Sequence, residues 1–149
     1  MTNRYSSLLI AVALLCVSSL SLSHHSRAPY YDLHKTVTVT GTVTKIDWIN
    51  PHTYIYLDVK TPAGTVEDWT VELYPIALMS RLGLKRDTIK IGEAITVRGM
   101  APKAGADFSR FPGRSDRNAA GAAPQVTSGL DLTLANGRRV LSPEAATRN

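Results

Sequence analysis

Cysteine is nearly absent from this sequence of 149 residues, which contains it once, at Cys16. That cysteine lies inside the apolar run Leu8–Val17, and the bulky Leu15 before it does not fit the small residue that a lipoprotein signal requires there. A chain that loses this segment contains no cysteine. Disulfide bonds, thiol catalysis and thiolate metal sites are then all excluded, so stability must come from packing of the core.

The sequence also has no apolar run long enough to cross a bilayer as a helix, which takes about 20 residues. Its longest run, Leu8–Val17, follows a short segment with one arginine and no acid, and it precedes the small residues of Ser18–Ser23. This order is typical of a secretory signal peptide, with cleavage after Ser23 or Ser21. We therefore expect residues 1–23 to be removed, leaving a periplasmic or secreted protein without a permanent membrane span.

Charge of either sign is sparse and nearly balanced. The sequence carries a formal net charge of +5, and loss of Arg4 with the leader leaves 16 basic residues against 12 acidic ones, a net charge of +4. So small an excess is typical of an ordinary soluble protein and gives little reason to expect nucleic acid as a partner. The length suits one domain with a substantial core.

What the sequence does contain is a series of strand patterns. Residues 24–34 have no clean period and predict an extended N-terminal arm. Thr36–Thr44 alternates hydroxyl and apolar residues, as in a half-buried strand, and the phase change that follows predicts a β-bulge. Thr53–Lys60 and Val66–Leu73 alternate in the same way around a Pro-Ala-Gly turn. The three strands should form an antiparallel meander.

One short helix and further strands complete the pattern. Pro75–Leu82 predicts the helix, with proline in its first turn and Gly83 after its end. Two further strands are predicted at Ala94–Met100 and Gly129–Leu134. Asn136-Gly137 predicts a hairpin turn, and Arg138–Leu141 a short closing strand.

This order of elements predicts an all-β protein, a small OB-like Greek-key β-barrel of five to six strands with one short helix between strands 3 and 4. The barrel domain should span residues 35–141. Residues of about 101–128 have too little apolar surface to offset their ordering entropy and predict a flexible insertion, and residues 142–149 predict a disordered tail. A β-sandwich is the alternative, but it needs more strands.

Six features lie along the predicted domain. They are His24-His25-Ser26 after the leader, Tyr31-Asp32, the Thr/Val strand with Gly41, Trp48-Ile49-Asn50-Pro51-His52 in the first turn, Trp69-Thr70-Val71-Glu72 in the third strand, and Asn-Gly-Arg near residue 137. In this combination the chain resembles a family of small exported bacterial proteins of unknown function. The resemblance implies export and a compact β-barrel, and it implies no activity. The chain departs from the family's pattern in its insertion around Asp107–Thr127 and in Leu73-Tyr74, so a loop-borne function of the family need not apply here.

Histidines near the new N-terminus are the first candidates for chemistry. Cleavage after Ser23 makes His24 the first residue, and cleavage after Ser21 makes it the third. In both cases a free amine and an imidazole can chelate one metal ion, which suits the tetragonal preference of Cu(II). We therefore expect either a copper or other transition-metal site built from His24, His25 and His52, or an unstructured remnant of the leader.

A predicted His–Glu pair is the second candidate. His52 opens the second strand and Glu72 ends the third, and the inferred pairing places Thr53 and Tyr54 opposite Glu72 and Leu73. The two side chains should therefore be neighbours. Such a pair can act as a general base, orient a metal ligand or simply fix a turn. No nucleophile stands beside it in a suitable context, so we predict no catalytic residue.

An outward row of aromatic residues on the second strand is the third candidate. On an OB barrel this face usually binds oligonucleotides or sugars. Three acidic side chains share the face, which together with export excludes nucleic acid and favours a sugar, a peptide, a cation or a partner protein. Ordinary cross-strand packing of tyrosines is the alternative. The predicted ligand-binding face consists of Trp48, His52, Tyr54, Tyr56 and Glu72.

These patterns predict an exported, periplasmic binding protein with no assignable catalytic activity. Its partner would be an unknown small molecule, a metal ion or a protein of the cell envelope. A protein that binds copper or another transition metal through its N-terminal histidines is the first alternative, and a His/Glu-dependent enzyme is the second.

Overall fold

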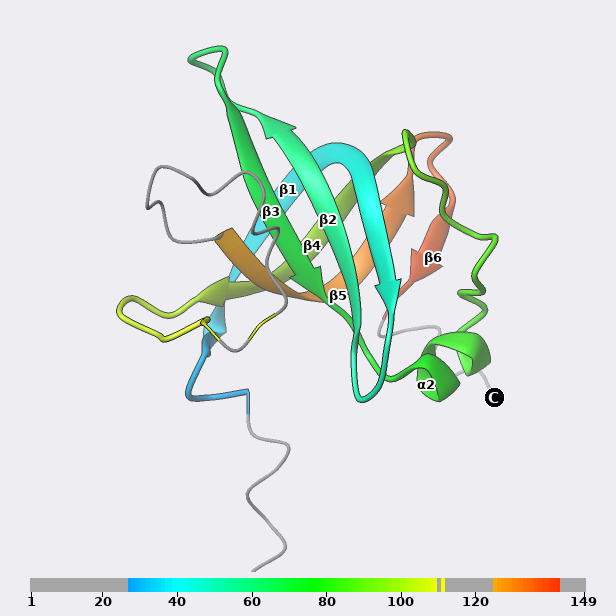
Figure 1. The fold of residues 1–149 in the computed structure, drawn as a ribbon, viewed down its shortest axis with the longest axis horizontal. Helices are drawn as coiled ribbons and strands as arrows, with labels where there is room; N and C mark the ends of the chain where they lie inside the picture. The colour runs from blue at the N-terminus through cyan, green and yellow to red at the C-terminus, as the bar shows by residue number, and fades with distance from the viewer. Residues whose placement is uncertain (1–26, 110, 112–124, 143–149) are drawn as a thin grey trace, which may run out of the picture.

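The computed structural model of the protein describes residues 27–109, 111 and 125–142. These residues form six strands and one short helix (Figure 1). The elements in chain order are β1 (Tyr31–Trp48), β2 (Thr53–Lys60), β3 (Val66–Glu72), α2 (Ile76–Arg81), β4 (Ala94–Pro102), β5 (Gln125–Leu134) and β6 (Arg139–Leu141). The predicted all-β class is confirmed, as is the place of the helix between the third and fourth strands.

β1 is the long strand around which the barrel curves (Figure 1). Its first part pairs antiparallel with β4 and its last part with β2, and the two parts meet at Thr42. The predicted bulge is present, because the register shifts between Val43 and Lys45. β1 begins inside the segment that was expected to be an arm, because Tyr31 pairs with Pro102 at the end of β4.

Gly41 allows β1 to approach β2 closely at the bend. A Cβ atom at this position would lie 2.7 Å from the carbonyl oxygen of Asp58 and 2.9 Å from Cγ2 of Val59. Both distances are shorter than ordinary van der Waals contact. The missing side chain is therefore what lets the two backbones come together here.

β2 and β3 form the predicted hairpin, and β2 has the predicted bounds. Tyr54 pairs with Glu72 at one end of the hairpin, and Lys60 pairs with Val66 next to the turn. Gly64 in the turn has a φ of 82°, which favours glycine. This register brings the start of β2 against the end of β3, where the predicted site residues lie.

The sheet closes into a barrel through β5. The strand order is β3-β2-β1-β4-β5-β6, and a parallel pairing joins β5 back to β3, up to the pair Glu72–Ser128. This is the predicted OB-like barrel. The predicted insertion at about 101–128 is shorter at both ends, because backbone pairing extends β4 to Pro102 and starts β5 at Gln125. Residues 110 and 112–124 lie outside the described residues.

The hydrophobic core lies inside the barrel and is closed at one end by α2 (Figure 1). Residues of alternating position on β1 to β5 supply it, together with Val140 and Leu141 of β6, and Met79 of the helix is fully buried. The helix is one residue shorter at each end than the predicted Pro75–Leu82, because Pro75 precedes its first turn and Leu82 follows its last. Gly83 comes after its end with a φ of 83°, as predicted. Within the described residues, no helix has the length and apolar character needed to span a membrane.

Candidate functional site

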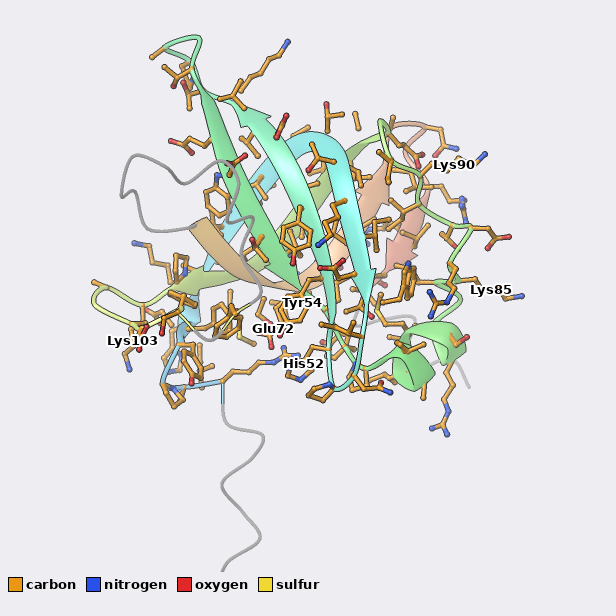
Figure 2. All side chains as sticks on the ribbon, viewed as in Figure 1. His52, Tyr54, Glu72, Lys85, Lys90 and Lys103 are labelled. Carbon is orange, nitrogen blue, oxygen red and sulfur yellow. The ribbon has the colours of Figure 1, made fainter. Side chains whose placement is uncertain are left out.

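A His–Glu pair lies at the end of the hairpin opposite its turn. Nδ1 of His52 is 2.5 Å from Oε1 of Glu72. His52 directly follows the cis Asn50–Pro51 peptide bond, and the pairing of Tyr54 with Glu72 brings the two side chains together. Figure 2 shows His52, Tyr54 and Glu72 clustered at this end of the hairpin. The predicted proximity of His52 and Glu72 is confirmed.

Glu72 is a buried carboxylate on the outer face of the barrel. Its neighbours Val71 and Leu73 belong to the core, so strand alternation turns Glu72 away from it. Even so, the residue is only 5% exposed. Burying a carboxylate is costly unless the charge is paired or hydrogen-bonded, so the partners of Glu72 decide what this position can do.

Tyr31, at the start of β1, is the second partner of Glu72. Its hydroxyl donates a hydrogen bond to Oε2 of Glu72 at 2.8 Å, and the residue is 1% exposed. Burial and the nearby carboxylate raise the pKa of Tyr31 well above its usual range. Tyr31 therefore stays a donor at any physiological pH. The two carboxylate oxygens are divided between Tyr31 and His52, which fixes the carboxylate in place.

Ser128 lies beside Glu72 across the parallel β3–β5 pairing. The residue is fully buried, and its hydroxyl oxygen has no hydrogen-bond partner in the described part of the chain. A buried hydroxyl without a partner carries an energetic cost. The Ser128 hydroxyl is therefore still available for hydrogen bonding beside Glu72, as is the buried hydroxyl of Thr53 next to His52.

Aromatic side chains cover this network. Tyr30, just before β1, together with Phe108 and Phe111 from the loop after β4, forms what we call the aromatic cap. Ring centroids are 5.1 Å apart for Tyr30 and Phe111 and 5.2 Å apart for the two phenylalanines. The cap contacts the site through Phe108 on Tyr31, at 5.7 Å, and Phe111 on Tyr54, at 6.4 Å. These are favourable aromatic contact distances.

Contacts outside the β-ladders join the two segments of the aromatic cap. The backbone N–H of Lys103 donates to the carbonyl of Tyr30 at 2.9 Å, and Nζ of Lys103 donates to the carbonyl of Ala28 at 3.2 Å. Phe111 N–H donates to the carbonyl of Phe108 at 2.9 Å. These bonds hold the two segments of the cap together beside the first pair of the β1–β4 ladder, Tyr31 and Pro102.

The predicted aromatic row lies on the predicted face but is not exposed. Tyr54 is 8% exposed and Tyr56 is 1% exposed. Tyr54 is covered by the aromatic cap. Tyr56 donates a hydrogen bond to Asp47 at 2.9 Å, and Nζ of Lys45 lies 5.1 Å from its ring centroid. Tyr56 thus follows the packing alternative, while Tyr54 belongs to the site around Glu72.

Other predicted site residues lie elsewhere. Trp48 packs against the core, and the guanidinium of Arg86 is 5.4 Å from its ring centroid, so Trp48 does not join the pair of His52 and Glu72. His24 and His25 lie outside the described residues. Over residues 27–109, 111 and 125–142, no group of three or more His, Cys, Asp or Glu side chains is placed to hold a metal ion.

The network fixes both the orientation and the tautomer of His52. With the Nδ1 proton donated to Glu72, Nε2 of a neutral ring is left as an acceptor or a metal ligand. The His52 side chain is 29% exposed, so the ring can be reached from solvent. A buried carboxylate that holds a histidine in this way supports either a metal ligand or a general base in many proteins.

The buried tyrosines predict a loss of stability at alkaline pH. Burial and the Glu72 carboxylate raise the pKa of Tyr54 from 10.0 to about 12. Between these values the unfolded chain releases the proton and the folded chain keeps it, so stability is complete below pH 10 and falls as pH rises toward 12. Urea unfolding at several pH values should give a smaller decrease for Tyr54→Phe than for the wild type. Equal decreases would contradict the raised pKa.

Sequence reasoning missed Tyr31 and the aromatic cap. Tyr31 is 41 positions away from Glu72, and the rings of Phe108 and Phe111 come from the predicted insertion. The available signal was the presence of large aromatic residues in two segments that are otherwise small or polar. Such residues in a segment without strand or helix period indicate packing onto another part of the fold.

Comparisons with known proteins bear on the fold and the family. A family model described as a family of unknown function (DUF6152) matches residues 11–109. No curated protein matches the chain. A crystal structure of the mitochondrial single-stranded DNA binding protein Rim1 from S. cerevisiae is similar, with 9% identity, coverage of 68% of this chain and 93% of that chain, and a TM-score of 0.44. A second crystal structure of that protein, labelled with selenomethionine, is 10% identical, covers 67% of this chain and 92% of its own chain, and has a TM-score of 0.40. At these scores the likeness carries no information on function.

Proposed function

Since the chain belongs to DUF6152, a family of unknown function, we propose its function from the site itself: it is an exported binding protein that holds a cationic ligand beside Glu72 and His52. The ligand would bind on the outer face of the barrel, at the end of the β2–β3 hairpin.

The observation that carries this proposal is the buried carboxylate of Glu72. In the described part of the chain its partners are the hydroxyl of Tyr31 and the ring of His52, and no lysine or arginine forms an ion pair with it. The site contains a buried carboxylate whose desolvation is only partly offset by these two contacts. A bound cation supplies the missing opposite charge, so this burial favours cation binding.

The aromatic cap also favours a positively charged ligand. Aromatic faces attract cations through their quadrupole, and Phe108 and Phe111 contact Tyr31 and Tyr54, the two tyrosines beside Glu72.

Acidic residues on the hairpin act against an anionic partner. Asp58 of β2 pairs directly with Asp68 of β3, on the same face as Glu72. Phosphate groups would be repelled by this arrangement, which is the opposite of the basic groove that single-stranded nucleic acid needs. The hairpin face thus favours a cationic ligand over nucleic acid.

The proposal that the protein is exported is based on residues 1–23. Residues 1–23 have the charged, apolar and small-residue segments of a signal peptide, in that order. A leader of this kind directs the domain to the periplasm or outside the cell, where a small binding protein can capture a ligand from solution.

Two cationic probes of different chemistry test the proposal, tetramethylammonium and Zn(II). We expect at least one of them to shift the amide NMR signals of residues 52–54 and 72 in the ¹⁵N-labelled protein. Glu72→Gln keeps the shape of the side chain and removes its charge, so it should weaken that binding at least tenfold. Glu67→Gln makes the same change at an exposed position of β3 and should have no effect.

Two results would overturn the proposal. One is that neither probe shifts the signals of residues 52–54 and 72. The other is that Glu72→Gln binds both probes as tightly as the wild type does, because the ligand would then not depend on the buried charge.

A further inference from the structure

We propose that the outer face of β1, β4, β5 and β6 binds an acidic polysaccharide, whose carboxylate groups contact Arg98 and Arg139. These four strands are neighbours in the sheet (Figure 1). The two arginines do not belong to the site around Glu72. This inference therefore goes beyond the proposed function and is tested independently of it.

Arg98 of β4 is held in one orientation by a buried carboxylate. Its Nε donates a hydrogen bond to Oδ2 of Asp131 at 2.7 Å, and its Nη2 donates to the same oxygen. The Asp131 side chain is 8% exposed, whereas the Arg98 side chain is 45% exposed. One edge of the guanidinium is thus fixed to the sheet. The donors on its other edge are left for an oxygen anion, which a guanidinium binds through two parallel hydrogen bonds.

A second guanidinium lies beside the same carboxylate. Nη2 of Arg139, on β6, is 3.9 Å from Oδ1 of Asp131, and the Arg139 side chain is 58% exposed. Two guanidiniums therefore face a single carboxylate. A ligand anion that contacts both adds a second negative charge to this cluster, and arginine is the side chain best suited to bind a carboxylate in this way.

Threonine hydroxyls continue this surface in two rows across the sheet. One row pairs Thr38 of β1 with Arg98 and Arg98 with Asp131. The other row consists of Thr40, Thr96, Thr133 and Arg139, each paired with the next across neighbouring strands. Directly paired residues share one face of a sheet, and neighbouring strands are about 4.8 Å apart, so the second row extends over roughly 14 Å. An extended ligand rich in hydroxyl groups matches such a row.

The side chains of the two rows distinguish between classes of anionic partner. Hydroxyls and guanidiniums form hydrogen bonds with the hydroxyl and carboxylate groups of an acidic sugar chain. Neither row contains an aromatic side chain on which a nucleic-acid base would stack. Neither contains a large apolar side chain that would enter a bilayer, as peripheral membrane proteins require. The face therefore fits an acidic polysaccharide better than nucleic acid or an anionic membrane.

The experiment adds hexagalacturonate, a chain of carboxylated sugars, to the ¹⁵N-labelled protein and follows the amide NMR signals. We expect shifts at residues 96–98, 131–133 and 139, and no shifts with maltohexaose, a neutral chain of the same length. Arg98→Gln and Arg139→Gln should each weaken binding by about tenfold, since each removes a charge-assisted contact. Arg81→Gln makes the same change at an exposed position of α2 and should bind as the wild type does.

Asp131→Asn separates a positioned site from simple attraction by net charge. The variant is more positive than the wild type, yet it should bind hexagalacturonate roughly fivefold more weakly, because Arg98 loses the charge-assisted hydrogen bonds that orient it. Tighter binding would show that net charge alone acts, and it would overturn the proposal. If Arg98→Gln leaves Asp131 unpaired and fails to fold, which circular dichroism checks, Arg98→Gln/Asp131→Asn removes both charges together and should show the tenfold loss.

Three further results would overturn the proposal. One is that hexagalacturonate shifts none of these signals. Another is that its affinity is unchanged in Arg98→Gln and in Arg139→Gln. The third is that phosphatidylglycerol vesicles or oligo(dT) shift these signals and hexagalacturonate does not, which would assign the face to a different class of partner. Since each of these results concerns residues outside the Glu72 site, the proposed function would stand in all three cases.

Discussion

Replacing Leu132 with alanine should lower the free energy of unfolding by about 2–5 kcal/mol. Leu132 is 0% exposed, and β5 places it in register with Val97 of β4 and Leu141 of β6. Loss of its branched end leaves a cavity inside the barrel. The surrounding strands are held at fixed spacing by their ladder hydrogen bonds, so they cannot collapse fully into the space.

Leu33→Ala is the matched control, since Leu33 is 51% exposed on β1. It should change the free energy of unfolding by no more than about 0.5 kcal/mol. Urea unfolding followed by tryptophan fluorescence measures both variants. Losses of equal size would mean that the interior of the barrel does not hold the main apolar core.

The β2–β3 hairpin was predictable because all its signals are local. Period-2 alternation gave the bounds of β2, and the turn between the strands set their register. Counting back from the turn placed Tyr54 opposite Glu72, as the structure has it. The contact of His52 with Glu72 then followed from position alone. This is the part of the site that the sequence could supply.

Closure of the barrel was not predictable in the same way. The first residues of β5, Gln125–Ser128, look like the end of a polar loop, yet they pair in parallel with Trp69–Glu72 of β3. The pairing satisfies backbone groups, and backbone hydrogen bonds leave little trace in side-chain composition. Their partners are also far away in sequence. The insertion predicted from composition therefore included Gln125–Ser128, which belong to β5.

The burial of side chains on the outer face of the barrel was also not predictable from the sequence. Alternation gives the face on which Tyr54 and Tyr56 lie, but it cannot say what covers that face. The cover over Tyr54 comes from Phe111, which alternation within β2 cannot reveal. Leu130 is a related case. The alternation of β5 predicts that it points inward, but it is only half-buried, because the register of β4 and β5 shifts next to Gly99.

Replacing Tyr31 with phenylalanine should lower the free energy of unfolding by about 2–3 kcal/mol, although it removes a single oxygen atom. The change keeps the buried ring and deletes the donor that reaches Oε2 of Glu72 at 2.8 Å. That oxygen is then buried without a hydrogen bond, and the desolvation penalty is larger for a charged group than for a neutral one. Urea unfolding at neutral pH measures the loss.

The adjacent residue provides the control. Tyr30→Phe alters a ring of the aromatic cap that is only half-buried, so its effect should stay within about 0.5 kcal/mol. Introducing Tyr31→Phe into Glu72→Gln tests the cause directly. An amide is cheaper to leave unsatisfied than a carboxylate, so the loss should shrink by at least about 1 kcal/mol in that background. A loss of the same size in both backgrounds would assign the effect to ring packing, and the buried charge would then not govern this end of the hairpin.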